Sequence, residues 1–189
     1  MKRLGLAASM LVFVVGVLFA GLNLHELAHT VAARLGGDLT AHYSLYNWGE
    51  GGGCVGCNWY DPSHLSLLGN LVVTVAGVLA TQVVVLALVV WGAARRRGSL
   101  PRRLALVAAA CLLLDFLLQF TQGLLAQVTA QRHLTRVDFA DTLYLLHHQL
   151  SLGAGVLKAG MVVTAAVYAV LLVAVFRTRA RGAPPAAAV

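Results

Sequence analysis

Four long apolar stretches are the feature that most constrains how this chain can fold. They run from Leu4 to about Leu24, from Leu65 to Trp91, from Leu104 to about Val128 and from about Leu152 to Phe176. A helix needs about 20 mostly apolar residues to cross the hydrocarbon core of a bilayer. Each stretch is long enough, so the sequence predicts an all-α membrane protein with four transmembrane helices.

The composition excludes several other classes of protein. Of the 189 residues, 59% are apolar and 11% are charged, whereas a soluble domain carries about 25% charged residues. A soluble enzyme, a disordered chain and a disulfide-rich secreted module are therefore excluded. The net charge of +7 would suit nucleic-acid binding, but the basic residues form short clusters between apolar runs. Because such clusters set membrane topology, we expect the lipid bilayer as a partner and no nucleic acid.

The basic clusters also predict the orientation. If the spans alternate in direction, all the clusters fall on one side, which the positive-inside rule makes cytoplasmic. We therefore expect an integral, multi-pass protein of a bacterial-type plasma membrane, with both termini cytoplasmic and the segments Gly36–His64 and Thr129–Ser151 outside. Arg132 and Arg136 in the second outer segment weigh against this orientation. The clusters are Lys2 with Arg3, Arg95–Arg97 with Arg102 and Arg103, and Arg177 with Arg179 and Arg181.

The chain is expected to form one domain over residues 1–176. Residues 177–189 are basic and then rich in Pro and Ala, which predicts a disordered cytoplasmic tail. The Gly-rich stretch Trp48–Cys54 is typical of a loop. Before it, Leu39–Tyr46 alternates enough to predict a short extracytoplasmic β-strand or hairpin after the first helix.

A histidine pair ends the first apolar stretch. His25 and His29 are four residues apart, so on a helix they lie on one face and can aim two imidazoles at one ion. Glu26 lies beside the first of them. This is the H-E-x-x-H arrangement of zinc peptidases, in which the Glu acts as general base. The ion lowers the pKa of a bound water to about 7, and the Glu takes its proton and can pass it to a leaving amine.

The position of this motif favours a functional role over a chance occurrence. Each charged side chain costs roughly 2.5–3.5 kcal/mol at the bilayer centre and less near the interface. Residues of this kind normally face a cavity or a partner. His25 and His29 come about 20 residues after the span begins, so we expect the active site near the extracytoplasmic face.

The segment His25–His29, followed by Thr-Val-Ala-Ala-Arg-Leu-Gly-Gly, resembles the opening of the site-2 protease family of membrane-embedded zinc metallopeptidases. It is most similar to the compact members, which lack PDZ and CBS domains. Gly69–Leu71 and Ala76–Ala80 resemble the family's A-G-P-L-A-N-type helix, although Val78 stands where Pro is usual. The resemblance covers about the first half of the chain. It implies one Zn²⁺ per chain and a polypeptide substrate, transmembrane or membrane-adjacent.

The third zinc ligand is less certain, because the family's N-x-x-P-x-x-x-x-L-D-G pattern is absent from this chain. Candidates should lie at the depth of the histidines. We rank Asp141 first, because it resembles the Asp after the third span in compact members, and Asp138 second. His64, Asp115 and His147 follow. Asp115 lies about 15 Å below the outer surface at 1.5 Å per residue, which fits the ion poorly.

Each of these candidates also has a simpler interpretation as a solvated interfacial residue. Asp115 forms a polar stripe with Gln119 and Gln122, for which interhelical hydrogen bonding is the preferred interpretation over a role next to the metal ligands or in a water path.

Cys54 and Cys57 form a C-x-x-C motif, for which a local disulfide is the preferred interpretation over a redox pair. Two alternative functions remain open. One is a non-catalytic metal- or haem-binding protein, with His25 or His29 opposite His147 or His148 as axial ligands. The other is a C-x-x-C thiol oxidoreductase. The substrate, the cleavage site and the oligomeric state are not predicted.

Overall fold

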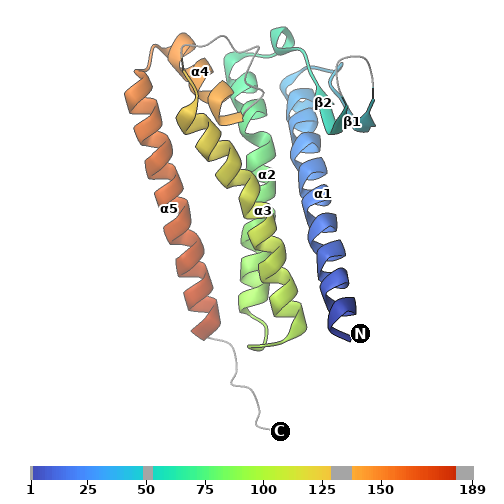
Figure 1. Ribbon diagram of the computed structural model, residues 1–189. Helices are drawn as coiled ribbons and strands as arrows, with labels where there is room; N and C mark the ends of the chain where they lie inside the picture. The colour runs from blue at the N-terminus through green and yellow to red at the C-terminus, as the bar shows by residue number, and fades with distance from the viewer. Residues whose placement is uncertain (1, 49–52, 129–137, 182–189) are drawn as a thin grey trace.

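The computed structural model describes residues 2–48, 53–128 and 138–181. It is a helical bundle with a small β-hairpin at one end (Figure 1). The elements are α1 (Lys2–Gly36), β1 (His42–Asn47), β2 (Cys54–Trp59), the 3-10 helix η1 (Pro62–His64), α2 (Leu67–Ala93), α3 (Leu100–Leu125), α4 (Asp138–Leu150) and α5 (Ala154–Arg181).

Four of these helices, α1, α2, α3 and α5, are long and apolar enough to cross a membrane. The prediction of a multi-pass helical membrane protein is therefore confirmed. The predicted Gly-rich loop falls largely on residues 49–52, and the predicted tail falls largely on residues 182–189. Both of these ranges, and residues 129–137 with Arg132 and Arg136, lie outside the described residues.

Helix α1 is longer than we predicted. It has 35 residues, which makes it about 52 Å long at 1.5 Å per residue, against a hydrocarbon core of about 30 Å. The helix continues past Leu24 because no helix breaker occurs before Gly36 and Gly37. His25 therefore lies well inside α1, about 16 Å before its C-terminal end.

A glycine ends α1. Gly37 has a φ of +114°, a left-handed conformation that suits glycine. Its N–H donates to the carbonyl of Arg34, and the N–H of Asp38 donates to the carbonyl of Ala33. These two hydrogen bonds form a Schellman motif, which satisfies the last carbonyls of the helix and turns the chain toward the hairpin.

Helix α2 is the centre of the bundle, because α1, α3, α4 and α5 all pack against it. Ser66 caps its N-terminus by accepting a hydrogen bond from the N–H of Gly69. A buried apolar cluster of Val85, Ala109 and Leu112 joins α2 to α3. No residue in the most apolar part of α5 is fully buried inside the protein, which suits a helix that faces lipid tails on most sides.

The hairpin confirms the predicted strand after the first helix. β1 and β2 are antiparallel, with His42 opposite Trp59, and the rings of these two residues stack 4.9 Å apart. Arg34 Nε donates to the Ala41 carbonyl at 2.7 Å, and the Tyr43 hydroxyl donates to Asn23 Oδ1. Both contacts tie the hairpin region to α1, and Arg34 belongs to the part of α1 that extends beyond the predicted span.

Helix α4 was not among the predicted helices, and it lies in the segment that we expect outside the membrane. The backbone N–H of Asp138 donates to Gln119 Oε1 at 3.0 Å. Gln119 lies about 9 Å before the end of α3, so α4 begins inside the bundle and rises toward the hairpin end (Figure 1). Its buried residues are Ala140, Leu143 and Leu145.

The start of α1, the α2–α3 connection and the end of α5 lie at the same end of the bundle, opposite the hairpin (Figure 1). The basic clusters of the sequence fall at this end, as alternating spans require. The side of the membrane that this end faces stays a prediction.

A buried aspartate organises the connection between α1 and α2. Asp38 accepts hydrogen bonds from the N–H and hydroxyl of Thr40 and from the N–H of Asp61, and its Oδ1 lies 3.0 Å from His64 Nδ1. The hydrogen bonds from Thr40 and His64 hold the pKa of Asp38 well below its ordinary value. The hydrogen bond to Asp38 raises the pKa of His64.

These pKa shifts predict a pH window for the connection. Asp38 ordinarily has a pKa of 3.8, so the stability that its carboxylate adds to the connection is complete above that pH and is lost as the pH falls through the lowered pKa. His64 ordinarily has a pKa of 6.5, so the stability that its imidazolium adds is complete below that pH and is lost as the pH rises through the raised pKa. We expect hydrogen-exchange protection of the Thr40 and Asp61 amides to be highest between about pH 4 and 6.5. In the variant His64→Asn, protection of these amides should no longer fall at alkaline pH but should still fall at acid pH. An unchanged fall at alkaline pH would contradict this account.

Candidate metal centre

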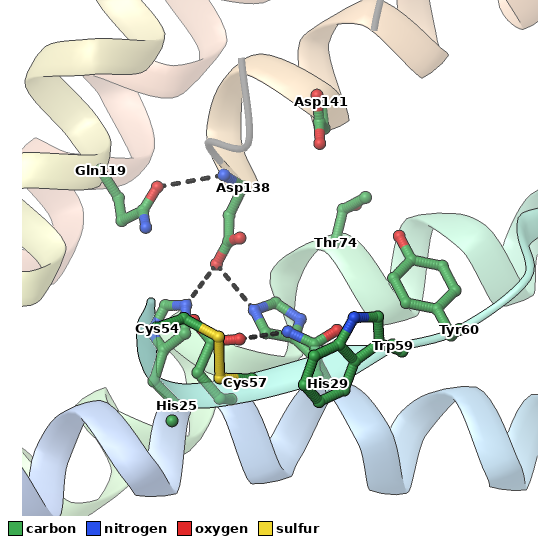
Figure 2. Close-up of a pocket in the computed structure, with 13 residues that line it drawn as sticks. His25, His29, Cys54, Cys57, Trp59, Tyr60, Thr74, Gln119, Asp138 and Asp141 are labelled. Atoms are coloured by element: carbon green, nitrogen blue, oxygen red, sulfur yellow. Dashed lines mark hydrogen bonds and ion pairs between the residues drawn. A yellow bond between two sulfur atoms is a disulfide. The ribbon is translucent and has the colours of Figure 1, made fainter. Parts of the chain in front are cut away.

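Two imidazoles and one carboxylate meet inside the bundle. His25 and His29 project from α1, and Asp138 projects from the first turn of α4 (Figure 2). Asp138 Oδ2 lies 3.0 Å from His25 Nε2 and 3.3 Å from His29 Nε2. The three ligand atoms lie within 4.8 Å of one another. Both histidines are buried, so this cluster is shielded from bulk solvent.

The other nitrogen of each ring fixes the tautomer. His25 Nδ1 lies 2.9 Å from Asp115 Oδ2, and His29 Nδ1 lies 2.6 Å from the Val73 carbonyl oxygen. Both partners are acceptors, so each Nδ1 donates. A neutral imidazole has one donor and one acceptor nitrogen. When both rings are neutral, as metal ligands must be, each Nε2 therefore presents a lone pair to Asp138.

Asp138 supplies a third lone pair. Its Oδ2 is a buried atom with no hydrogen-bond donor among the described residues. An unpaired buried oxygen is costly, and with neutral rings no proton lies between it and the two nitrogens. A cation at the centre of the three atoms would satisfy all of them.

Zinc fits this donor set. Two bonds of about 2.1 Å that meet at the tetrahedral angle hold their ligand atoms about 3.4 Å apart. The two distances from Asp138 Oδ2, 3.0 and 3.3 Å, are close to that separation. Three N and O ligands also leave a fourth tetrahedral position open, as catalytic zinc sites require.

Gly77 of α2 makes room for the imidazoles. A Cβ at this position would lie 2.5 Å from both His25 Nε2 and His29 Nε2. No side chain other than hydrogen fits there unless the rings move. Gly77 belongs to the stretch Ala76–Ala80 that carries the weaker part of the family resemblance.

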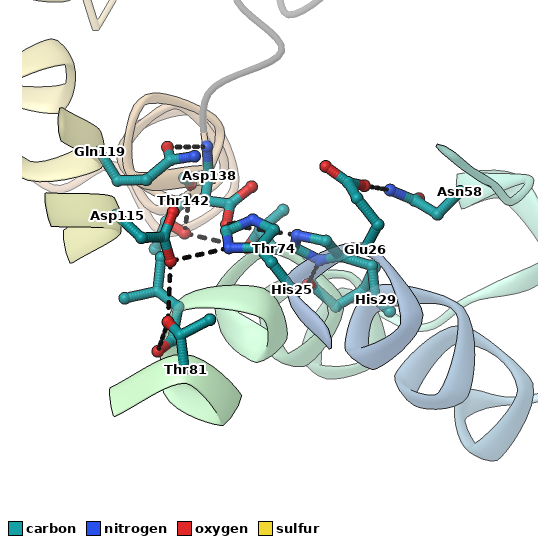
Figure 3. Close-up of polar contacts among 12 residues, drawn as sticks. His25, Glu26, His29, Asn58, Thr74, Thr81, Asp115, Gln119, Asp138 and Thr142 are labelled. Carbon is teal, nitrogen blue, oxygen red and sulfur yellow. Dashed lines mark hydrogen bonds and ion pairs between the residues drawn. The ribbon is translucent and has the colours of Figure 1, made fainter. Parts of the chain in front are cut away.

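The hairpin holds Glu26 beside the cluster. Glu26 Oε2 accepts a hydrogen bond from Asn58 Nδ2 of β2 (Figure 3). Gly56, with a φ of +62°, allows β2 to approach α1 so closely that a Cβ there would lie 3.4 Å from Glu26 Cγ. A disulfide joins Cys54 and Cys57, which flank Gly56 in this part of β2.

A cavity of about 370 Å³ opens over the cluster and Glu26. It lies between β2 and α4, and no lysine or arginine lines it among the described residues. A cavity of this size can hold a short segment of polypeptide. Its lining is His25, Glu26, His29, Cys54, Gly56, Cys57, Asn58, Trp59, Tyr60, Thr74, Gln119, Asp138 and Asp141.

The geometry favours Asp138 over Asp141, our first choice, as the third ligand. Asp138 is the first residue of α4, and its side chain reaches down toward the imidazoles. Asp141 also lines the cavity, but it lies one turn further along α4 and outside the cluster (Figure 2). Spacing in the sequence could not separate the two residues, because their order of approach depends on where α4 starts.

The other candidate ligands lie outside the cluster. Asp115 bonds to the far side of His25 and not to the central atoms. Our depth argument against it was wrong, because α1 continues to Gly36 and His25 therefore lies level with the middle of α3. His64 pairs with Asp38, and His147 Nδ1 lies 2.7 Å from the Leu152 carbonyl oxygen.

Sequence reasoning missed two supporting residues of the site, Asn58 and Gly77. Gly77 had a signal, since it lies in the stretch that resembles the family's apolar helix, but no role at the metal site was assigned to it. Asn58 had none, because its contact with Glu26 depends on how the hairpin folds back over α1. Gln119 was noticed as part of a polar stripe; the structure adds that it caps the start of α4.

Comparison with known proteins adds no identity. No family model, no curated protein and no solved structure matches this chain.

The fit around Gly77 leads to a prediction. Gly77→Ala should push the two rings apart, because its Cβ would lie 2.5 Å from both nitrogens. Overpacking of this kind costs about 1–3 kcal/mol, so we expect a lower unfolding temperature and at least about a tenfold loss of metal affinity. Thermal unfolding and elemental analysis of the purified protein measure both. Gly160→Ala is the matched control, since nothing lies within 4 Å of its Cβ position. Parental metal binding by Gly77→Ala would show that the rings do not sit against α2.

Proposed function

We propose that this protein is a membrane-embedded zinc endopeptidase. In this proposal His25, His29 and Asp138 hold one Zn²⁺ per chain, and Glu26 is the general base. The observation that carries the proposal is the convergence of two imidazole nitrogens and one carboxylate oxygen beside Glu26 in a cavity.

The chemistry assigns a role to each residue of the site. When bound, zinc supplies Lewis acidity and brings the pKa of a water molecule to about 7. Glu26 accepts the proton of the attacking water and returns it to the leaving amine. Asn58 holds one oxygen of Glu26, which fixes the direction in which the carboxylate faces the cavity.

The proposed substrate is a transmembrane or membrane-adjacent polypeptide. A helical peptide bond is already hydrogen-bonded within its own helix, so the substrate must unwind locally before it can be cut. β2 lines the cavity, and the sheet of the described residues has two strands. β2 therefore has one edge without a neighbouring strand, along which an extended polypeptide can align by strand addition.

The resemblance to site-2 proteases supports the same proposal from the sequence. The His25–His29 motif lies on an early spanning helix, and an aspartate from a later helix meets it. This chain departs from the family pattern at Val78 and in the segment around Asp138. The orientation of the basic clusters would place the site toward the extracytoplasmic face.

Haem binding and thiol oxidoreduction suit this arrangement less well, and a non-catalytic metal site would give no role to Glu26. A haem iron needs free space beside its axial histidine, but Asp138 lies within 3.3 Å of both ring nitrogens, and Gly77 lies against them. A thiol oxidoreductase would use the Cys54–Cys57 disulfide, but it would give no role to the histidine cluster. The peptidase proposal accounts for both the cluster and Glu26.

Substitution of Glu26 separates catalysis from metal binding. We expect Glu26→Gln to bind zinc like the parent and to lose at least about 100-fold in cleavage rate, because a general base contributes about 10²–10⁴. The rate is measured on casein in detergent. New protein N-termini in the membranes of expressing cells are counted by mass spectrometry. Equal cleavage and equal sets of new N-termini for parent and Glu26→Gln would exclude the proposed mechanism.

Two aspartates of α4 provide a matched pair for the ligand assignment. Asp138→Asn should abolish stoichiometric zinc binding, because it weakens one of three ligands. Asp141 lines the same cavity one turn away, and the variant Asp141→Asn should retain one zinc per chain. Elemental analysis after dialysis against a weak chelator measures both. The opposite pattern would restore our first choice from the sequence.

A further inference from the structure

A chain of hydrogen bonds runs from α5 through α2 and α3 to His25. Tyr168 Oη donates to Gln82 Oε1 at 2.9 Å, and Gln82 Nε2 donates to Thr81 Oγ1 at 3.2 Å. The Thr81 hydroxyl lies 2.7 Å from Asp115 Oδ2, closer than the 2.9 Å to the Val78 carbonyl. His25 Nδ1 meets the same Asp115 oxygen at 2.9 Å. Figure 3 shows the part from Thr81 to His25.

This series of hydrogen bonds lies within the spanning helices, where buried polar groups are energetically costly. Thr81 and Gln82 are buried, and Asp115 lies near the middle of α3. A charged Asp at mid-span costs roughly 2.5–3.5 kcal/mol. Interhelical hydrogen bonds contribute about 0.6 kcal/mol each on average, so helix association alone does not offset the cost of Asp115. A role at the site is the stronger explanation.

All donors in the chain point the same way, toward Asp115. Its Oδ2 accepts from Thr81 on one side and from His25 on the other. Donors aligned in series polarise one another and strengthen each bond. Because Asp115 remains the acceptor, His25 Nδ1 keeps its proton, and the lone pair stays on Nε2, where the cluster needs it.

The two histidines are held differently. His29 Nδ1 donates to a main-chain carbonyl, that of Val73, which no side-chain substitution removes. His25 depends on side chains alone. Tyr168 is held in place by the ring of Phe116, 5.4 Å away, so α5 is coupled to His25 although most of α5 faces outward.

We propose that Asp115, Thr81, Gln82 and Tyr168 form a positioning chain that fixes the tautomer and ring orientation of His25 and thereby sets the metal affinity of the site. The inference rests on the proposed zinc site and deepens it. Groups that bond to the outer nitrogen of a ligating histidine typically change metal affinity by about 10–100-fold when they are removed.

The test uses the full chain, purified in detergent. Zinc affinity is measured by competition with a chromophoric chelator, and ligand geometry is measured from the visible absorption of the Co²⁺-loaded protein. Asp115→Asn should weaken zinc binding by about 10–100-fold. Thr81→Val and Tyr168→Phe act through Asp115, and they should weaken it by successively smaller factors within about 10-fold.

Two further variants separate positioning from simple stabilisation. Thr81→Ser keeps the hydroxyl, and it should restore both the zinc affinity and the Co²⁺ spectrum that Thr81→Val changes. Thr164→Val removes a hydroxyl that donates to the carbonyl of Gly160 in its own helix, and it should leave both unchanged. A merely structural chain would lower the unfolding temperature of the metal-free protein and leave the Co²⁺ spectrum as in the parent.

The outcomes distinguish the two proposals. If the parent binds zinc, and Asp115→Asn and Thr81→Val match its zinc affinity and its Co²⁺ spectrum, the positioning chain is overturned and the zinc site is not. A parent that binds neither Zn²⁺ nor Co²⁺ overturns the zinc site and this inference with it. If Thr81→Val does not fold, Asp115→Asn and Tyr168→Phe decide, because parental zinc affinity and a parental Co²⁺ spectrum in both would overturn the positioning chain.

Discussion

The meeting of two imidazole nitrogens and one carboxylate oxygen inside an apolar bundle is the interaction on which the rest of this structure depends. Three lone pairs that face one another without a proton repel, and burial strengthens the repulsion. The outer nitrogens of His25 and His29 both donate to acceptors. These contacts stabilise the tautomers whose Nε2 lone pairs face Asp138, an arrangement that is unfavourable without a cation. A divalent cation at the centre would offset this cost.

The fold brings these atoms together from distant parts of the chain. The length of α1 sets the histidines below the hairpin end of the bundle. α4 starts inside the bundle, where Gln119 caps its first N–H, and this start carries Asp138 down to the histidines. Gly77 lets the central helix pass beside both rings. The hairpin reaches back to hold Glu26 through Asn58. Each of these elements thus positions at least one side chain of the site.

The sequence predicts well what depends on composition and local spacing. Four apolar stretches predict the spanning helices, and the i, i+4 spacing of His25 and His29 predicts their common face. It fails where tertiary contacts decide. The choice between Asp138 and Asp141 depends on where α4 begins, and the depth of Asp115 depends on where α1 ends. α4 itself is short and half polar, so it resembles a loop between spans. The partners of Glu26 and Asp115 come from other elements and leave no local pattern.

X-ray absorption spectroscopy of the zinc-loaded protein tests the central claim most directly, because it reports the identity of the metal's neighbours without knowledge of any substrate. The account predicts one zinc per chain with two imidazole nitrogens and oxygen ligands at about 2.0–2.2 Å. Sulfur neighbours at about 2.3 Å, which would point to Cys54 and Cys57, or fewer than two imidazoles, would contradict it.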